Sequence, residues 1–171
     1  MTSDRPPSDP TSAEVTLREL RPGDIGWVIG RHGAVYWEEY EWNIDFEVLV
    51  TQISADFHAN FKTGRENAWI AEVGGARAGC VCVCERDQET AQLRILLVEP
   101  WARGLGVGSW LVDECLKFAR QVGYTKMMLW TNSVLVAARQ IYEACGFELV
   151  EEEPHHSFGH DLIGQNWELD L

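Results

Sequence analysis

The sequence lacks long apolar runs and is poor in basic residues. None of its apolar stretches reaches the length of about 20 residues that crosses a membrane. Lys and Arg total 14 against 27 Asp and Glu, which gives a formal net charge of −13. Nucleic acid phosphates repel an acidic surface. We therefore expect a protein that binds neither nucleic acid nor a membrane.

The opening residues, MTSDRPPSDPTSAE, lack the cationic start and the apolar stretch of a secretory signal. Without such a signal, we expect a cytoplasmic protein. Pro, Ser and Asp are frequent here, and this composition predicts disorder over residues 1–13. No internal repeat or interdomain linker follows, so residues 14–171 are predicted to form a single domain, long enough to bury a core.

The five cysteines are an odd number, which favours free thiols in a reducing compartment. Three of them, Cys80, Cys82 and Cys84, alternate with valine and would share one face of a strand. A zinc site of this kind needs a second pair of cysteines, which the sequence does not offer. We interpret the three thiols as small buried side chains and predict no metal.

Hydrophobic periodicity and turn residues predict the element order β, α, α, β, β, β, α, β, α, β, β. The predicted strands cover 15–20, 68–73, 76–84, 92–98, 126–131, 147–152 and 166–171. The predicted helices are a stretch that follows Asp24 and runs to about Tyr40, an apolar stripe from Phe46 to Phe61, a stripe from Leu111 to Val122 that Gly123 closes, and 134–145. Asp24 is the expected N-cap of the first helix. A strand–helix–strand unit predicts a parallel or mixed sheet.

The segment VEPWARGLGVGSWL places Gly104, Gly106 and Gly108 between a predicted strand and a predicted helix. Unpaired N–H groups and the positive end of the helix dipole make such a turn an anion site. Arg103 adds a permanent charge that suits phosphate oxygens. Neither the Walker pattern nor the dinucleotide pattern GxGxxG fits this spacing. The alternative is that the glycines only allow close packing at a helix start.

Three motifs together resemble one family. Arg103-Gly104-x-Gly106-x-Gly108 is similar to the acetyl-CoA loop of the Gcn5-related N-acetyltransferases (GNAT), the preceding LLVEP to their fourth strand, and AARQIYEACGF to their Tyr-Gly-Phe helix. The resemblance implies an α/β fold with a mixed sheet of six to seven strands, about four helices, and a splay between strands four and five. The chain looks closest to bacterial-type acetyltransferase domains fused to MarR-type regulators, although it contains no winged-helix portion.

In that family the loop amides hold the coenzyme A pyrophosphate, and the pantetheine arm runs beside the fourth strand. The resemblance therefore implies acetyl-CoA as co-substrate, with no metal. The implied coenzyme-binding residues are Leu96, Val98, Arg103, Gly104, Leu105, Gly106, Val107, Gly108, Ser109, Asn132 and Arg139. For Asn132 two interpretations stay open: its side chain reaches the coenzyme, or it only caps the next helix.

The implied reaction is direct attack of a primary amine on the thioester within a ternary complex. Tyr142 matches the family tyrosine that hydrogen-bonds and can protonate the leaving sulfur, although helical spacing also fits a core aromatic. A backbone N–H at Leu96 or Leu97 would polarise the acetyl carbonyl, and Leu97 is the residue we assign. The strand QLRILLV carries no carboxylate, so the base some relatives place there is missing. Other candidates for the base are Glu38, Glu39, Glu41, Glu72 and the histidines.

The acceptor is expected between the N-terminal helices and the segment EEEPHHSFGH, which Pro154 and Gly159 predict to be a loop. The expected acceptor-binding residues are Trp37, Glu38, Tyr40, Trp42, His155 and His156. Aromatic faces near Glu suit a cation with an apolar part. The acceptor is then an amine of a small molecule, a peptide or a protein.

Two other functions fit the loop. A non-catalytic acyl-CoA sensor would keep Arg103 and the glycines without making product, and a nucleotide-binding domain would use the same cradle. The family forms both monomers and dimers, so a homodimer is possible.

Overall fold

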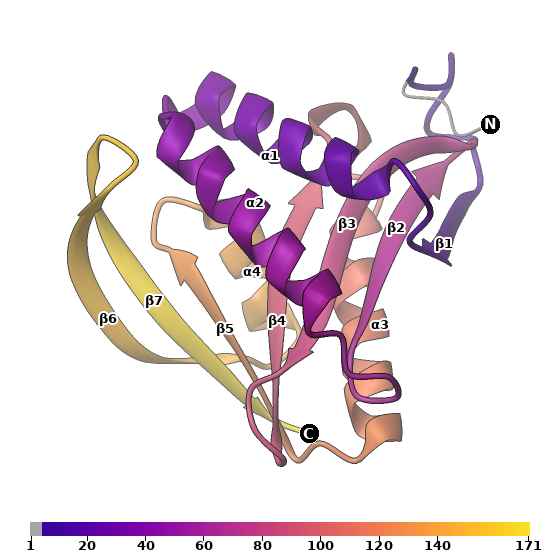
Figure 1. Cartoon of the computed structure of the whole chain (residues 1–171). Coiled ribbons are helices and arrows are strands. Elements are labelled where there is room, and N and C mark those ends of the chain that lie inside the picture. The colour runs from indigo at the N-terminus through magenta and orange to yellow at the C-terminus, as the bar shows by residue number, and fades with distance from the viewer. Residues whose placement is uncertain (1–4) are drawn as a thin grey trace.

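The computed structural model describes residues 5–171, which form one sheet with helices on both faces (Figure 1). The strands are β1 (Val15–Glu19), β2 (Asn67–Val73), β3 (Ala76–Glu85), β4 (Thr90–Val98), β5 (Lys126–Asn132), β6 (Glu148–Ser157) and β7 (His160–Asp170). The helices are α1 (Asp24–Tyr40), α2 (Ile44–Ala59), α3 (Val107–Val122) and α4 (Val136–Ala144), with a short 3-10 helix, η1 (Pro100–Ala102), before α3. The predicted element order and the mixed sheet are confirmed.

The sheet separates between β4 and β5. Its strand order is β1-β2-β3-β4-β5-β7-β6, and β4 and β5 are its parallel pair. These two strands pair only over Thr90–Leu93 and Lys126–Leu129, although β4 continues to Val98 and β5 to Asn132. The predicted splay between the fourth and fifth strands is therefore confirmed, and it opens toward the carboxyl ends of both strands.

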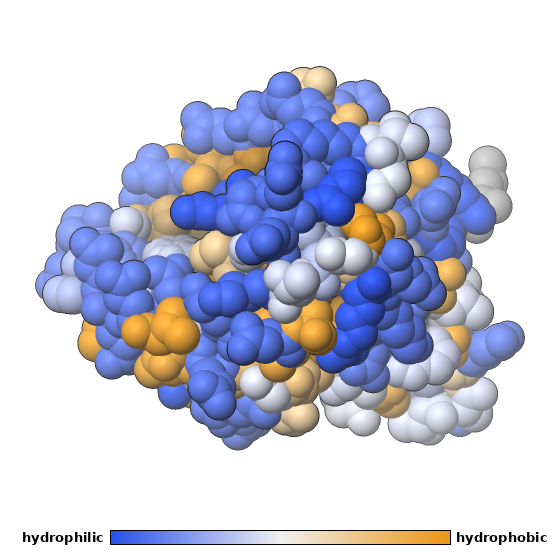
Figure 2. Space-filling view, turned by 90° about the horizontal axis from the view of Figure 1, so that it is seen from below, coloured by the Kyte–Doolittle hydropathy of each residue, from blue (hydrophilic) through white to orange (hydrophobic). Residues whose placement is uncertain are grey.

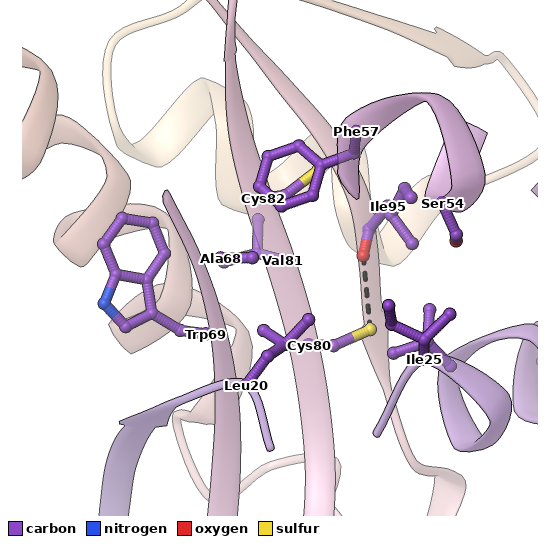
Figure 3. A pocket seen from close by; sticks show the side chains of 11 residues that line it. Leu20, Ile25, Ser54, Phe57, Ala68, Trp69, Cys80, Val81, Cys82 and Ile95 are labelled. Atoms are coloured by element: carbon purple, nitrogen blue, oxygen red, sulfur yellow. Dashed lines mark hydrogen bonds between the residues drawn. The ribbon is translucent and has the colours of Figure 1, made fainter. Parts of the chain in front are cut away.

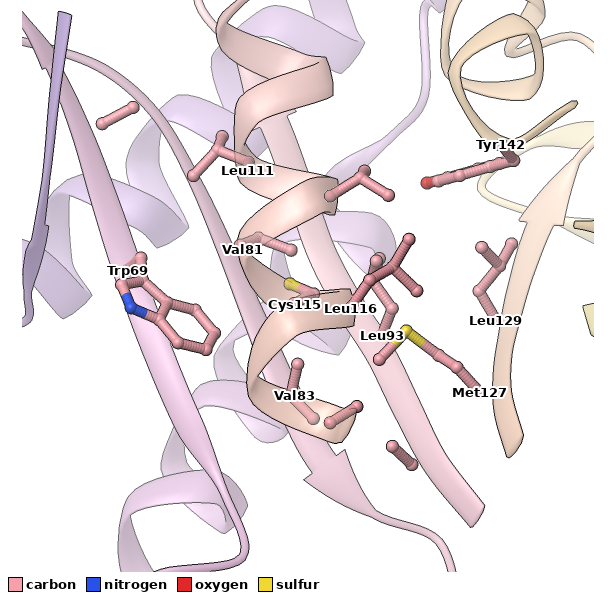
Figure 4. Close-up of a cluster of buried hydrophobic side chains, with 14 of the residues drawn as sticks. Trp69, Val81, Val83, Leu93, Leu111, Cys115, Leu116, Met127, Leu129 and Tyr142 are labelled. Carbon is pink, nitrogen blue, oxygen red and sulfur yellow. The ribbon is translucent and has the colours of Figure 1, made fainter. Parts of the chain in front are cut away.

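The core has two parts, one on each face of the sheet. On one face α1 and α2 pack over β2, β3 and β4, and on the other face α3 and α4 cover the sheet (Figure 1). Figure 4 shows the second part, where Leu111, Cys115 and Leu116 of α3 meet Val81 and Leu93 of the sheet. The stripe on α3 that the sequence indicates is the side that faces this core, and Gly123 ends the helix with φ 95° as expected.

The predicted cap of α1 is wrong. Gly23, with φ 97°, precedes the helix, and Asp24 is its first residue. The Asp24 carboxylate is buried and accepts hydrogen bonds from Arg18 at 2.6 Å, from Arg77 at 3.2 Å and from the backbone N–H of Arg21 at 2.7 Å. Because Arg18 lies on β1 and Arg77 on β3, this cluster ties the start of α1 to the sheet.

Two helices are shorter than their apolar stripes. α2 ends at Ala59, so Phe61 lies beyond it, with its ring 5.4 Å from that of Phe57. α4 starts at Val136, two residues after the predicted Val134. Apolar side chains continue past the end of α2 and precede the start of α4, so periodicity overstates the length of both helices.

The segment EEEPHHSFGH is part of a hairpin and not the predicted loop. β6 runs through it and pairs with β7, with Pro154 opposite Ile163. β6 is an edge strand, where the missing N–H of a proline is tolerated. Phe158 and Gly159 make the turn, with φ values of 57° and 83°, which is the combination that two-residue hairpins favour.

Cys80, Cys82 and Cys84 share one face of β3, as predicted. Cys80 and Cys82 line a small cavity of about 30 Å³ together with Ile25 and Phe57 (Figure 3). The Sγ atoms of Cys82 and Cys84 lie 3.9 Å apart. These cysteines are free thiols, and Cys80 and Cys82 face α1 and α2.

The N-terminal residues 5–13 contain neither a helix nor a strand. Asp9 accepts hydrogen bonds from Thr11 and Ser12 in a turn, and the N–H of Gly74 donates to Glu14 at 3.0 Å. Residues 1–4 of the predicted disordered tail lie outside the described residues.

The face in Figure 2 is mainly hydrophilic, with separate small hydrophobic patches. None of the helices within residues 5–171 combines the length and the apolar composition needed to cross a bilayer.

Candidate functional site

Two pockets meet where β4 and β5 separate. The first, which we call the loop pocket, has a volume of about 440 Å³. It is lined by Val35, Tyr36, Glu39, Tyr40, Leu96, Leu97, Val98, Ala102, Arg103, Gly104, Gly106, Gly108, Ser109, Leu135, Ala137, Ala138 and Ile141. The glycine loop, the end of β4, α1 and the start of α4 thus surround one space.

The glycine loop presents bare backbone to the loop pocket. Gly104 and Gly106 have φ values of 81° and 79°, and a Cβ at either position would meet no atom within 4 Å. No side chain caps α3, whose first hydrogen bond runs from the N–H of Trp110 to the oxygen of Gly106. The preceding N–H groups at the start of this helix have no intrahelical acceptor, so the loop offers donors and a positive potential to an anion.

Gly108 has a different role from the other two glycines. A Cβ on Gly108 would lie 2.6 Å from Cδ1 of Ile141 and 3.4 Å from Cγ2 of Val98. This glycine therefore allows α3 to pack closely against α4 and β4. Gly104 and Gly106 thus fit the interpretation as an anion site, and Gly108 fits the interpretation as a packing position.

Charged pairs fix both sides of the loop. The buried Glu99 carboxylate accepts two hydrogen bonds from Arg31 of α1, at 2.5 and 2.9 Å. Arg103 forms an ion pair with Glu39 of α1, with a shortest distance of 2.7 Å. The Arg103 guanidinium is partly exposed at the pocket wall, so a second anion can share it.

The second pocket, which we call the gap pocket, has a volume of about 480 Å³. It is lined by His32, Tyr36, Trp42, Phe46, Leu49, Val50, Ile53, Arg86, Gln92, Leu93, Arg94, Ile95, Leu96, Met128, Trp130, Thr131, Asn132, Leu135, Ala138, Tyr142 and Asn166. Tyr36, Leu96, Leu135 and Ala138 line both pockets. A ligand in one pocket can therefore touch a ligand in the other.

Tyr142 reaches the gap pocket from α4. Its ring enters the core beside Leu129 (Figure 4) and packs edge-on against Phe147, with ring centroids 5.9 Å apart. Within residues 5–171 its hydroxyl has no hydrogen-bond partner. Burial raises the pKa of this hydroxyl well above its usual value, and the nearby Tyr36 hydroxyl raises it further. Tyr142 therefore stays protonated and can donate a hydrogen bond into the pocket.

The backbone of β4 bulges beside the pockets. Ile95 has φ 56°, and its carbonyl accepts a hydrogen bond from the Cys80 thiol at 3.3 Å (Figure 3). Burial raises the pKa of this thiol, and the backbone N–H of Leu97 opposes this shift. Leu97, the donor that we assign from the sequence, lines the loop pocket. Leu96, the alternative donor, lines both pockets.

Asn132 does not cap α4. Its buried side chain accepts a hydrogen bond from Nε2 of His155 at 2.8 Å, and Nδ1 of His155 contacts Oγ of Ser157 at 2.9 Å. The residue before α4 is Leu135, with no side-chain cap. Asn132 lines the gap pocket, whereas His155 is not among the lining residues. The His155 ring packs against the ring of Trp130, with centroids 5.5 Å apart.

Several residues expected in the site lie outside both pockets. Arg139 donates to the carbonyl of Ser133 at 2.9 Å and packs over Trp167, away from the loop pocket. Trp37 and Glu38 are exposed on α1, and His156 points outward to Asp161. Neighbouring side chains on a strand point to opposite faces, and neighbouring side chains on a helix point in different directions. Residues that are adjacent in the sequence to a pocket residue can therefore point away from the pocket.

Other expected residues divide between the two pockets. Tyr40 lines the loop pocket and Trp42 the gap pocket. Leu105 and Val107 pack in the core, so only their backbone faces the loop.

The gap pocket contains no carboxylate among its lining residues. Of the carboxylates considered as a base, Glu39 binds Arg103, Glu72 binds Arg18 at 2.6 Å, and Glu41 ends α1. His32 is the imidazole in the pocket wall. Burial lowers its pKa to about 4, although its contact with the carbonyl of Val28 at 2.8 Å opposes this shift. His32 is therefore neutral at neutral pH.

The sequence interpretation missed several lining residues, among them Tyr36, Phe46, Arg94 and Trp130. Arg94 left a signal, since it is the charged residue inside the apolar strand QLRILLV. Trp130 belongs to a strand predicted to be buried, yet it is 45% exposed at the open end of the gap. Within the described residues, no three His, Cys, Asp or Glu side chains are grouped as metal ligands would be.

The comparisons with known proteins agree with this architecture. Residues 33–147 match the acetyltransferase (GNAT) family. A putative acetyltransferase of Salmonella typhimurium, yncA, solved with its cofactor acetyl-CoA, superimposes with a TM-score of 0.74 at 20% identity, covering 91% of this chain and 93% of that one. Spermidine N-acetyltransferase from Vibrio cholerae, solved with CoA and spermine, gives a TM-score of 0.71 at 18% identity, with 91% and 95% covered.

Curated relatives match over a shorter stretch. The zebrafish (Danio rerio) N-acetylaspartate synthetase is 34% identical over 85 residues, which is 49% of this chain and 30% of that protein. N-acetyltransferase family 8 member 2 of Rattus norvegicus is 33% identical over 99 residues, or 55% and 44%. The matches thus span less than half of the length of these two relatives. The family match covers more than half of the chain, and this protein belongs to the acetyltransferase (GNAT) family.

Proposed function

We propose that this protein transfers the acetyl group of acetyl-CoA to a primary amine by direct attack in a ternary complex. The observation that carries the proposal is the junction of the two pockets at the separation of β4 and β5. One pocket has an anion cradle, and the other has the hydroxyl of a buried tyrosine, which has no partner among the described residues. A nucleotide-binding domain would not need the second pocket.

The residues of the loop pocket fit a coenzyme with a pyrophosphate. The backbone of Gly104 and Gly106 and the first amides of α3 would hold the phosphates, with Arg103 as a further donor. The pantetheine arm would lie along Leu96 and Val98, which line the same pocket. When bound, the coenzyme supplies a thioester, an acyl group that an amine can attack.

The chain's own groups then act on the acyl transfer. The acceptor nitrogen forms a bond to the acetyl carbon, the C–S bond breaks, and the amine loses one proton. Tyr142 stays protonated and donates a hydrogen bond to the leaving sulfur, which lowers the barrier as negative charge develops there. Because no carboxylate lines the gap pocket and His32 stays neutral down to about pH 4, pocket water is the proton acceptor that we assign.

The acceptor is a separate question. Relatives and structural neighbours are named for acceptors of opposite charge, an amino acid in N-acetylaspartate synthetase and a polyamine in spermidine N-acetyltransferase. The aromatic wall of Tyr36, Trp42 and Phe46 supports an acceptor with an apolar part. The charge of the side chains that line the gap pocket supports one of these two kinds of acceptor, as argued below.

The test compares binding with turnover. Thiol release from acetyl-CoA is followed with a panel of amines, and acetyl-CoA affinity is measured by calorimetry. We expect Tyr142→Phe to lower kcat by about 100-fold while the Kd changes by less than about twofold. Tyr124→Phe is the matched control, because Tyr124 is buried but donates to the carbonyl of Arg65, outside both pockets. Full activity of Tyr142→Phe would refute the role of this hydroxyl, and acetyl-CoA binding without any turnover would favour a sensor.

A further inference from the structure

We propose that the acceptor is a small primary amine that also carries a carboxylate, and that Arg94 binds this carboxylate in the gap pocket. The inference rests on the proposed acetyl transfer, and it specifies the acceptor. It reverses the expectation of a cationic acceptor that the glutamates of α1 suggested.

Arg94 faces the gap pocket because of its register in β4. It lies opposite Cys82 of β3, on the face of the sheet that α1 and α2 cover. Gln92 lies two residues earlier on the same face, opposite Met128 of β5. All three of Arg94, Gln92 and Met128 line the pocket. The side chain therefore comes from a rigid strand in the floor of the pocket.

Arg94 is half-buried and has no hydrogen bond or ion pair within residues 5–171. Other arginines with comparable burial are paired: Arg18 binds Asp24 and Glu72, and Arg65 binds Glu85. Placing a guanidinium partly out of water without a partner is unfavourable. An unpaired arginine in a pocket is thus a donor set that a bound anion would complete.

The charge around Arg94 favours an anion. The lining of the gap pocket includes a second arginine, Arg86, and no carboxylate, although the whole chain has a net charge of −13. Two glutamates lie just outside this lining and are already paired: Glu151 accepts a hydrogen bond from the lining residue Asn166 at 2.9 Å, and Glu168, opposite Met128, binds Lys126 at 2.8 Å. Arginine matches a carboxylate with two parallel N–H donors, which gives direction as well as affinity.

The size of the pocket limits the acceptor. Arg94 and Tyr142 line the same space of about 480 Å³, a volume typical of small-molecule sites. The amine that reaches the acyl group and the carboxylate that meets Arg94 therefore belong to one short molecule. The aromatic wall of Trp42 and Phe46 leaves room for an apolar group. A free amino acid has this chemistry, whereas the N-terminus of a protein lacks the adjacent carboxylate.

The first arm of the test measures turnover on matched amines. Phenylalanine is compared with phenethylamine, which lacks only the carboxylate, and a dipeptide with N-terminal phenylalanine tests for a peptide acceptor. We expect kcat/KM for phenylalanine to exceed that for phenethylamine by about 10- to 100-fold, the usual scale of a hydrogen-bonded charge. In Arg94→Gln this ratio should fall toward 1 through a higher KM for phenylalanine, and Arg94→Lys should restore part of it. Arg120→Gln, an exposed charge on α3, is the control.

The second arm needs no catalysis. N-acetylphenylalanine and N-acetylphenethylamine are titrated into the protein saturated with CoA, and the same pair is repeated with Arg94→Gln. Tighter binding of N-acetylphenylalanine than of N-acetylphenethylamine, with the difference lost in Arg94→Gln, would support the inference. This holds even if the protein turns over no amine. Absence of turnover would count against the proposed function alone. Turnover with equal preference, or an Arg94→Gln variant that weakens both members equally, would overturn the inference and leave acetyl transfer intact. The inference would also be overturned if phenylalanine were no better a substrate than phenethylamine and N-acetylphenylalanine bound no more tightly than N-acetylphenethylamine.

Discussion

The buried imidazole of His32 gives the protein a defined sensitivity to acid. His32 is 3% exposed, its ring is stacked at 6.0 Å on Tyr36, and burial lowers its pKa to about 4. In the unfolded chain the pKa of histidine is about 6.5. Below pH 6.5 His32 therefore binds a proton in the unfolded chain, whereas in the folded protein it stays neutral down to about pH 4. Stability from this residue is complete above pH 6.5 and is lost as the pH falls toward 4.

The size of the effect follows from the two pKa values. Between pH 7.5 and pH 5 the difference in proton uptake removes about 2 kcal/mol from the free energy of unfolding. The assay is urea unfolding at intervals of half a pH unit, with the parent protein and His32→Phe. Phenylalanine keeps an aromatic ring beside Tyr36 and does not titrate. We expect the His32→Phe variant to lose about 2 kcal/mol less than the parent over this range.

A second variant controls for the other histidines. His156 is exposed on β6 beside Asp161, so His156→Gln should keep the pH dependence of the parent. If His32→Phe loses as much stability as the parent between pH 7.5 and pH 5, then His32 is not the buried neutral base described here.

The remaining predictions concern the glycine loop. Gly108→Ala should destabilise the protein by about 0.5–2 kcal/mol in urea unfolding, because crowding of Cδ1 of Ile141 at 2.6 Å costs about 1–3 kcal/mol and the helix propensity of Ala offsets only about 0.5–1 kcal/mol of it. Gly30→Ala is the matched control on helix α1, where a Cβ meets nothing within 4 Å, and it should stabilise by about 0.5–1 kcal/mol; equal effects of the two would refute the packing role. Arg103→Gln should weaken acetyl-CoA binding by about tenfold in low salt, and by less in 0.5 M NaCl, since the guanidinium beside Glu39 is partly exposed. A loss that does not depend on salt would argue against a phosphate contact.

Much of the fold could be predicted because its signals are local. The strands of alternating or continuous apolar residues, the stripe on α3 and the glycines at turns each report on their own neighbourhood. The β6–β7 hairpin could not be predicted this way. Pro154 and Gly159 are loop signals in isolation, and only the position of β6 at the sheet edge makes the proline acceptable. Similarly, Asp24 resembles a cap until its arginine partners on two strands are known.

The site divides in the same way. The loop pocket is built largely from one contiguous motif, and Arg103, Gly104, Gly106 and Ser109 all line it. The gap pocket is assembled from α1, α2, β4, β5, β7 and α4, and its members are far apart in the sequence. A prediction from the aromatic segment of the sequence therefore includes Trp37 and Glu38, which face solvent. It does not include Arg94, which lies in a distant segment. Strand register, which decides the face of Arg94, becomes visible only when the sheet is assembled.

The most direct test of the central claim is calorimetric titration of the protein with acetyl-CoA, with ATP and NAD for comparison. Gly106→Val places a branched side chain in the loop pocket at φ 79°, and Gly75→Val imposes the same backbone strain at φ 80° in the remote β2–β3 turn. We predict one acetyl-CoA per chain, at least tenfold weaker binding of ATP and NAD, and at least a tenfold loss of acetyl-CoA affinity in Gly106→Val but not in Gly75→Val. Equal affinity for the three ligands, or an unchanged affinity in Gly106→Val, would contradict the assignment of the loop pocket to the coenzyme.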